Sequence, residues 1–268
     1  MNMNVESFAE EIRDRLMRRA DEDSYESYVN GHTRPAYRLG YALVELGEVD
    51  EAKHWFRALA STYCDGAEYT LQSKFAEERS HSGALPENAL QRALQTAIMT
   101  GETHVVSETG QRVYELLVDP PIRNLGTLDE LDGREERGRV DTIVTLAAFL
   151  TGRDTEDHIT AVRDHARAQS AKETPLFWEG TPFNIPHADL IEGLATNSRQ
   201  LVEDGINGLV WSHEEHRLGN GDIHDIEQQI DCVTTTAIVL ARSYGHDIRP
   251  DSEYIPSAAY SSEHYPLN

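Results

Sequence analysis

The sequence predicts an all-α protein, either an irregular helical bundle or an αα-superhelix. The first observation behind this prediction is that apolar residues recur three and four positions apart along most of the 268 residues, which places them on one face of a helix. The second is that many of these segments end at a glycine or just before a proline. The third is that no stretch shows the alternation of apolar and polar residues that is typical of a half-buried strand.

The N-terminal part illustrates the helical pattern. Phe8, Ile12 and Leu16 are spaced four residues apart and predict an amphipathic first helix. A second helix is expected over 35–46, because proline fits the first turn of a helix. Gly47 is the kind of residue that ends a helix.

A third helix is expected directly after Gly47, with Ala52, Trp55, Phe56 and Leu59 on its apolar face. Together with the second helix it resembles a tetratricopeptide helix hairpin. In this pairing the small Gly40 and Ala52 would let the helices approach closely, and Phe56 would fill the groove between them. The pattern does not return after about 34 residues, so tetratricopeptide-like hairpins are expected without a regular array.

The rest of the chain is predicted to continue as helices joined by polar or proline-rich connections. Helices are expected at 66–78, 87–100, 103–118, 140–150, 155–168, 187–203 and 224–244. A segment ending near His216 is expected to follow a weak join at Gly205 and Gly208, and a proline-rich loop or binding edge is expected at 174–186. The tail 251–260 is expected to dock on the body. We expect one all-α domain over 1–268, or a subdivision into 1–120 and 139–268 joined by the polar connection 121–138.

The charge balance is strongly acidic. There are 47 Asp and Glu residues against 24 Lys and Arg, a formal net charge of −23, and the lysines are Lys53, Lys74 and Lys172 alone. Such a composition is typical of proteins from a cytosol with molar salt, where the Debye length falls to about 3 Å and self-repulsion is screened. The alternative is an acidic ligand that mimics nucleic acid. Binding to nucleic acid itself is not expected, because the longest basic stretch is Arg13–Arg19.

The chain is expected to be cytoplasmic and not to enter a membrane. The N-terminal residues 1–14 have no apolar signal core, and no apolar run approaches the roughly 20 residues that span a bilayer. Cys64 and Cys232 are far apart in sequence and lie in apolar helical settings. They are expected to be buried, inert thiols, with a disulfide as the alternative.

One histidine-rich cluster is the best candidate for a metal site. His213-Glu214-Glu215-His216 resembles the motif of zinc proteases, with His224 downstream, but its histidines are three positions apart where that motif needs four. A solvated polar face is therefore expected, and His213, His216 and His224 stay as weak metal candidates. No phosphate-binding loop, nucleophile elbow or dinucleotide motif is found. The chain is expected not to be an enzyme, to have no catalytic residue and to hold no cofactor.

Aromatic residues supply the candidates for contact with a partner protein. They are Phe177, Trp178 and Phe183 in the proline-rich segment and the tail tyrosines Tyr254, Tyr260 and Tyr265, with core or docking roles as the alternative. A different group, Arg112, Arg123 and Arg242, lies in or beside apolar surroundings. Each is expected to pair with a carboxylate or with a carbonyl at a helix end.

The region Asp189–Tyr260 resembles immunity-protein family 49 of polymorphic toxin systems. The resemblance is carried by Leu190-Ile191-Glu192-Gly193, by the His-Glu-Glu-His-Arg segment at 213–217, by the helix 233–240 leading into Ala241-Arg242-Ser243-Tyr244-Gly245, and by the closing pattern up to Tyr254-Ile255-Pro256. It implies an all-helical cytosolic protein that neutralises a cognate toxin by direct contact and has no catalytic residues. The partner expected is thus a protein, in the first hypothesis a basic toxin. The alternatives are a tetratricopeptide-like adaptor that binds a peptide or protein, and a metal-dependent hydrolase that uses the His213–His224 region.

Overall fold

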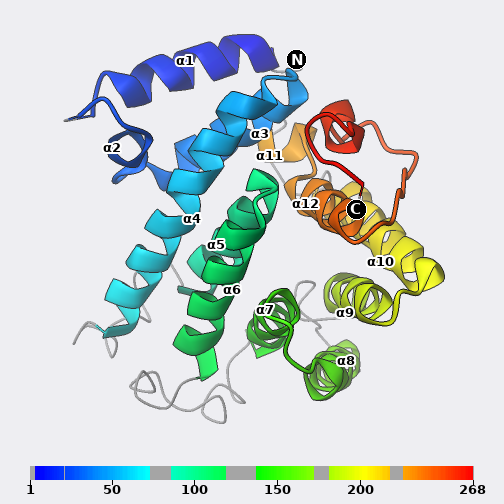
Figure 1. Cartoon of the computed structure of the whole chain (residues 1–268). Coiled ribbons are helices and arrows are strands. Elements are labelled where there is room, and N and C mark those ends of the chain that lie inside the picture. Colours follow the sequence, from blue (N-terminus) through cyan, green and yellow to red (C-terminus); the bar gives the residue numbers. More distant parts are fainter. Residues whose placement is uncertain are drawn as a thin grey trace. The chain divides into compact units, whose positions relative to one another are not determined.

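The computed structural model describes residues 4–20, 22–72, 86–118, 137–171, 181–217 and 226–267, and within these ranges the chain forms helices and turns without a strand. The all-α prediction is confirmed for this part of the chain (Figure 1). The helices in the N-terminal half are α1 (Val5–Met17), α2 (Tyr25–Val29), α3 (Thr33–Glu45), α4 (Val49–Gln72), α5 (Pro86–Thr100) and α6 (Thr103–Val118). Those in the C-terminal half are α7 (Arg137–Leu150), α8 (Glu156–Ser170), α9 (Thr181–Thr196), α10 (Arg199–Ser212), the π-helix η5 (His213–Arg217), α11 (Ile226–Gln229), α12 (Cys232–Ser243) and the 3-10 helix η6 (Ser257–Tyr260).

The chain divides into two compact units, and each is assembled from separate stretches of sequence. The first unit comprises 1–62, 95–105 and 210–268, and the second comprises 63–94 and 106–209. The boundaries fall inside α4, α5, α6 and α10. Most of the predicted connection 121–138 lies outside the described residues, and the number of domains stays a prediction.

In the first unit, α3 contacts α1, α2, α11 and η6 (Figure 1). The amphipathic pattern of α1 is confirmed, since Ile12 and Leu16 are buried while Asp14 between them is exposed. Gly47 ends α3 as expected, with a φ of 79° that residues with a side chain rarely adopt.

The predicted close approach within the α3–α4 hairpin is confirmed. A Cβ atom added to Gly40 would lie 2.5 Å from Cε1 of Phe56, so only glycine lets the Phe56 ring pack at this depth. Ala52 and Phe56 are both fully buried. One expectation is corrected: α4 runs without a break to Gln72, so no separate helix begins at 66, and the remainder of the predicted 66–78 helix lies outside the described residues.

In the second unit, α7, α8 and α9 pack against one another in pairs (Figure 1). The predicted helices at 140–150 and 155–168 are confirmed as α7 and α8, and the turn between them contains Gly152 at a φ of 69°. Before α8, the Asp154 carboxylate accepts a hydrogen bond from the Glu156 N–H at 3.0 Å. This contact satisfies one of the free N–H groups at the start of the helix.

The predicted helix at 187–203 is wrong, because the chain breaks at Asn197 and forms α9 and α10. Asn197 adopts the left-handed conformation with φ 54°, and the Ser198 N–H donates to the Gly193 carbonyl at 2.7 Å, which closes α9. The helix also starts earlier than expected, so residues 181–186 are helical and not a loop, while 174–180 lie outside the described residues.

The glycines that were expected to weaken the chain near 205 lie instead inside α10. A Cβ atom on Gly205 would lie 2.6 Å from the Leu190 nitrogen and 2.7 Å from the Pro186 carbonyl oxygen, both in α9. Similarly, a Cβ atom on Gly208 would lie 2.7 Å from the Pro186 ring. The glycines therefore allow the two helices to pack closely at their crossing.

The predicted last helix, 224–244, is also divided into two. Asp231 separates α11 from α12, since its carboxylate accepts hydrogen bonds from the Thr234 N–H at 3.0 Å and from the Thr234 hydroxyl and thereby caps α12. Gly245 ends α12 as expected, at a φ of 85°. The docking tail is confirmed as far as η6, which contacts α3 and α12.

Both cysteines are free and buried, as predicted. Burial raises the pKa of the Cys64 thiol to about 12. At pH 8 this thiol is therefore protonated, and the thiolate that reacts with disulfide reagents is almost absent.

We expect that neither cysteine reacts with Ellman's reagent within minutes at pH 8 in the native chain, because both side chains are buried and Cys64 is protonated. Both thiols should react at once after denaturation. The measurement is the absorbance of the released thiolate with and without guanidinium chloride. Rapid reaction of one thiol per native chain would contradict the burial described above.

Candidate protein-binding surface

His213 lies in the interior of the first unit and connects three segments of the chain. It begins η5 and is buried, with Nε2 3.3 Å from the Gln228 carbonyl oxygen and Nδ1 3.8 Å from Oδ1 of Asp231. Its ring centroid lies 5.2 Å from that of Tyr254 in the tail. The Asp231 N–H donates to the Tyr254 carbonyl at 2.8 Å, so the histidine, the cap of α12 and the tail form one junction.

Of the weak metal candidates His213, His216 and His224, the structure describes the side chain of His213. Within the described residues, no three His, Cys, Asp or Glu side chains are grouped so that they could hold a metal ion. His213 faces the interior, while His224 and the side chain of His216 lie outside what the structure describes.

The two segments that meet at this junction, η5 and the tail, each carry two exposed carboxylates. We call them the acidic edge: Glu214, Glu215, Asp251 and Glu253. The hydroxyl of Ser252 donates to Oε1 of Glu214 at 3.1 Å, which fastens the tail acids beside those of η5. Glu214 and Glu253, which are distant in sequence, thus both lie near the Tyr254 hydroxyl.

Tyr254 lies near the carboxylates of the acidic edge, and Trp211 precedes them in sequence. Tyr254 is half-buried, and burial together with the carboxylates of Glu253 and Glu214 raises the pKa of its hydroxyl. Trp211 lies three residues before Glu214, at the end of α10, and is 48% exposed. A half-exposed tryptophan beside charged groups is typical of contact surfaces between proteins.

The other aromatic candidates lie elsewhere or are not described. Tyr260 is half-buried in η6, and the Arg249 guanidinium lies 5.6 Å from the centre of its ring. Phe177 and Trp178 lie outside the described residues, and of Phe183 only the backbone in α9 is described. Sequence reasoning missed Trp211 and also Tyr244, which is 43% exposed at the end of α12. Trp211 could have been found from the sequence, because it is a large aromatic residue two positions before the His-Glu-Glu-His segment.

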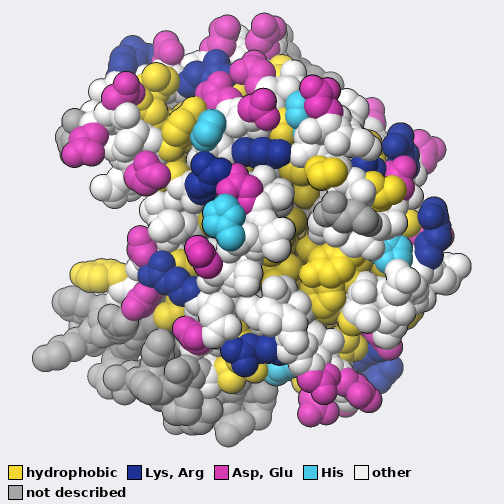
Figure 2. Space-filling view, in the orientation of Figure 1, with side chains coloured by type: hydrophobic (Ala, Val, Ile, Leu, Met, Phe, Trp, Pro, Cys, Tyr) yellow, Lys and Arg dark blue, Asp and Glu magenta, His cyan; other side chains and the backbone are white. Residues whose placement is uncertain are grey.

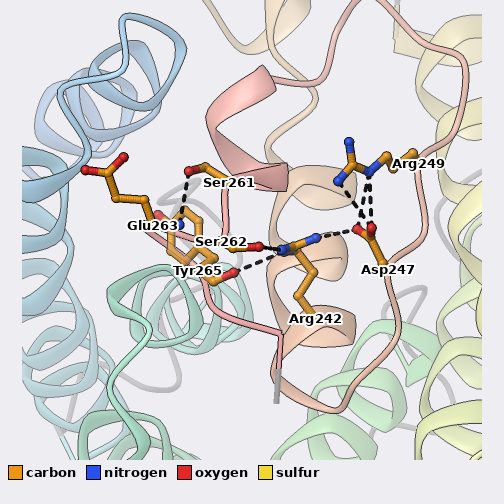
Figure 3. Close-up of polar contacts among 7 residues, drawn as sticks. All are labelled: Arg242, Asp247, Arg249, Ser261, Ser262, Glu263 and Tyr265. Atoms are coloured by element: carbon orange, nitrogen blue, oxygen red, sulfur yellow. Dashed lines mark hydrogen bonds and ion pairs between the residues drawn. The ribbon is translucent and has the colours of Figure 1, made fainter.

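Arg242 is the centre of a second polar cluster in the first unit (Figure 3). It is 1% exposed; its guanidinium forms an ion pair with Asp247 and donates to the Ser262 hydroxyl at 3.0 Å and to the Tyr265 carbonyl at 3.1 Å. The prediction that this arginine pairs with a carboxylate is confirmed. Arg249 shares the Asp247 carboxylate from the exposed side at 3.2 Å.

The sequence leads to the same prediction for Arg112 and Arg123, and the structure describes the first of them. Arg112, in the second unit, pairs with Asp65 at 2.7 Å and with Glu68 at 2.5 Å, as expected. Arg123 lies outside the described residues.

Acidic side chains are spread over the visible face, with arginines and lysines among them, and they gather most densely over α1 (Figure 2). Several of the arginines contact two carboxylates each, such as Arg13 with Glu48 and Glu51 at 2.7 and 2.9 Å. The excess negative charge is therefore carried by a surface of mixed sign and not by one acidic tract.

Comparison of the chain with protein-family models, curated proteins and solved structures gives no match. Among the described helices, none combines the length and the apolar character that crossing a membrane requires.

Proposed function

We propose that this chain is a binding protein, and specifically an immunity protein that neutralises a cognate toxin by direct contact. The observation that carries the proposal is the acidic edge in the first unit, in which Glu214 and Glu253 lie near Tyr254 and the exposed Trp211 comes three residues before Glu214 in sequence. Aromatic side chains next to exposed carboxylates suit a partner that presents lysines or arginines around an apolar patch. The resemblance of Asp189–Tyr260 to an immunity family supports the same function, since these residues contain the whole surface.

The relative contributions of the carboxylates and of Trp211 to binding depend on the salt concentration. At low ionic strength the carboxylates would steer a basic toxin toward the surface and fix its orientation. The composition supports adaptation to molar salt, in which steering is largely screened and Trp211 would have to supply most of the affinity. A cytosolic setting follows from this function, because the toxin must be met inside the cell.

The proposal predicts that cells making the toxin encoded beside this gene survive only when the chain is also made. The double variant Glu214→Lys/Glu253→Lys should bind the toxin at least about tenfold more weakly, because like charges then face each other across the interface. Survival in co-expression and binding by titration calorimetry measure the two effects.

The matched control is Glu10→Lys/Glu11→Lys, which changes two exposed residues of α1 and gives the same net charge. This control should bind the toxin as the unmodified chain does. Failure of the unmodified chain to protect would reject the immunity function. Equal weakening by both double variants would reject the acidic edge as the contact surface.

A second candidate function is an adaptor that binds a peptide or protein partner. It is favoured by one specific observation, the packing of Phe56 against Gly40 in the α3–α4 hairpin, which has the geometry expected of a tetratricopeptide unit. An adaptor would bind its partner in cells that carry no toxin, so recovery of a stoichiometric partner from such cells would favour this function over immunity.

A further inference from the structure

The first unit holds the end of its own chain in the manner of a bound peptide. We call residues 261–267 the C-terminal strap. Tyr265 is the one strap residue that is buried, at 2% exposure, while its neighbours are exposed or half-buried. The strap is therefore attached through a single aromatic anchor and a few polar contacts.

The anchor fits a defined site, the Tyr265 socket, which is formed by Lys53, Met99, Gly101 and Arg242. The Tyr265 hydroxyl donates to the Met99 carbonyl at 3.1 Å, and the Lys53 ammonium lies 5.0 Å from the ring centre. A Cβ atom added to Gly101 would lie 3.6 Å from the ring, an ordinary van der Waals contact, so Gly101 lines the socket.

Two cations hold the strap by its main chain. Lys53 donates to the His264 carbonyl at 2.7 Å, and Arg242 donates to the Tyr265 carbonyl at 3.1 Å (Figure 3). Every residue of a peptide carries such a carbonyl, so these two contacts do not select a sequence. The strap itself forms a turn, in which the Tyr265 N–H donates to the Ser261 carbonyl at 2.8 Å, and its Ser262 hydroxyl accepts from Arg242 at 3.0 Å. The socket thus suits a segment that turns before one aromatic side chain and carries a polar group near it.

The strap can leave without leaving a buried charge unpaired. The ion pair of Arg242 with Asp247 involves no strap residue and would persist. Lys53 likewise interacts with the carboxylates of Asp50 and Glu102. Losing the partner of a buried charge is the step that makes such an opening costly, and here both cations keep a carboxylate.

We propose that the Tyr265 socket is a binding site for a turn-forming peptide segment of a partner protein that carries an aromatic side chain, and that the C-terminal strap occupies this site in cis. The proposal does not depend on the toxin, since it concerns a different surface of the first unit. A tethered strap competes with an effective concentration in the millimolar range, so a partner segment binds well only when the strap is weakened or displaced.

The probe is a fluorescent synthetic peptide with the sequence of residues 259–268, titrated into the full-length chain and into full-length Tyr265→Ala. The variant should bind the peptide at least about tenfold more tightly than the unmodified chain, because its own strap no longer fills the socket. A peptide with alanine in place of the tyrosine at position 265 should bind neither. A folded variant without measurable affinity for the probe overturns the proposal.

Hydrogen exchange on the unmodified chain gives a test that does not depend on a variant. The Tyr265 amide donates to the Ser261 carbonyl at 2.8 Å, so its exchange reports on opening of the strap. The strap amides should exchange at least about 100-fold faster than those in the middle of α12, and exchange of both at one rate would make the strap a fixed part of the core. An unmodified chain that is dimeric and becomes monomeric as Tyr265→Ala would assign the socket to the strap of a second copy instead of a partner protein.

Discussion

Replacing Gly205 with alanine is expected to destabilise the second unit by about 3 kcal/mol or more. The added methyl group would lie 2.6 Å from the Leu190 nitrogen and 2.7 Å from the Pro186 carbonyl oxygen. Both are backbone atoms of α9, which cannot rotate away as a side chain can, so α9 and α10 would have to move apart. Urea denaturation followed by circular dichroism measures the loss as a lower midpoint.

Gly66 provides the matched control in the same unit. It lies in α4 and is exposed, and a Cβ atom there would meet nothing within 4 Å. Gly66→Ala should therefore raise stability by about 0.5–1 kcal/mol, because alanine favours the helix more than glycine does. If both alanine variants changed the urea midpoint in the same direction, close packing of α9 on α10 would not explain why position 205 requires glycine.

The helices themselves could be predicted because their signal is local. Ile12 and Leu16 are spaced for one face of α1. Pro35 lies in the first turn of α3 and Gly47 just after its end, which are the positions that their backbone preferences favour. The hairpin was also predictable, since Gly40 and Phe56 are close in sequence and their sizes are complementary. In these cases neighbouring residues determine the outcome.

The breaks inside predicted helices depended on residues that are ambiguous in sequence. Asn197 tolerates the left-handed conformation but also occurs within helices, and Asp231 serves as a helix cap only because the chain turns there. The glycines of α10 indicate a weak point when only the sequence is considered, whereas in the structure they are needed because the backbone of α9 lies against them. That reason is a tertiary contact, which no local pattern contains.

The candidate site was found in parts and not as a whole. The sequence singled out Tyr254 and the His-Glu-Glu-His segment, but their proximity depends on a contact across 38 residues between Ser252 and Glu214. The Tyr265 socket is harder still, since Lys53 reaches a carbonyl 211 positions away. Residue type indicates what a side chain can do, whereas its neighbours are supplied by the fold.

Arg242→Met is expected to destabilise the first unit by about 2–4 kcal/mol. Methionine retains part of the packing of the long side chain but removes the contacts with Asp247, with the Ser262 hydroxyl and with the Tyr265 carbonyl. Asp247 is 36% exposed and keeps Arg249, which limits the loss to the lower part of what breaking a buried pair can cost. Thermal and urea unfolding of the purified variant measure the change.

Arg249→Met tests whether burial is the cause, because Arg249 contacts the same carboxylate but is 61% exposed. Its loss should cost less than about 0.5 kcal/mol, as is usual for an exposed ion pair. Arg242→Met should also accelerate exchange of the Tyr265 amide by at least about tenfold, since two hydrogen bonds from a charged donor to the strap are removed. Equal destabilisation by the two variants would contradict this explanation. It would mean that the Asp247 carboxylate, which both arginines contact, stabilises this region, and that the contacts of the buried Arg242 guanidinium with the strap do not.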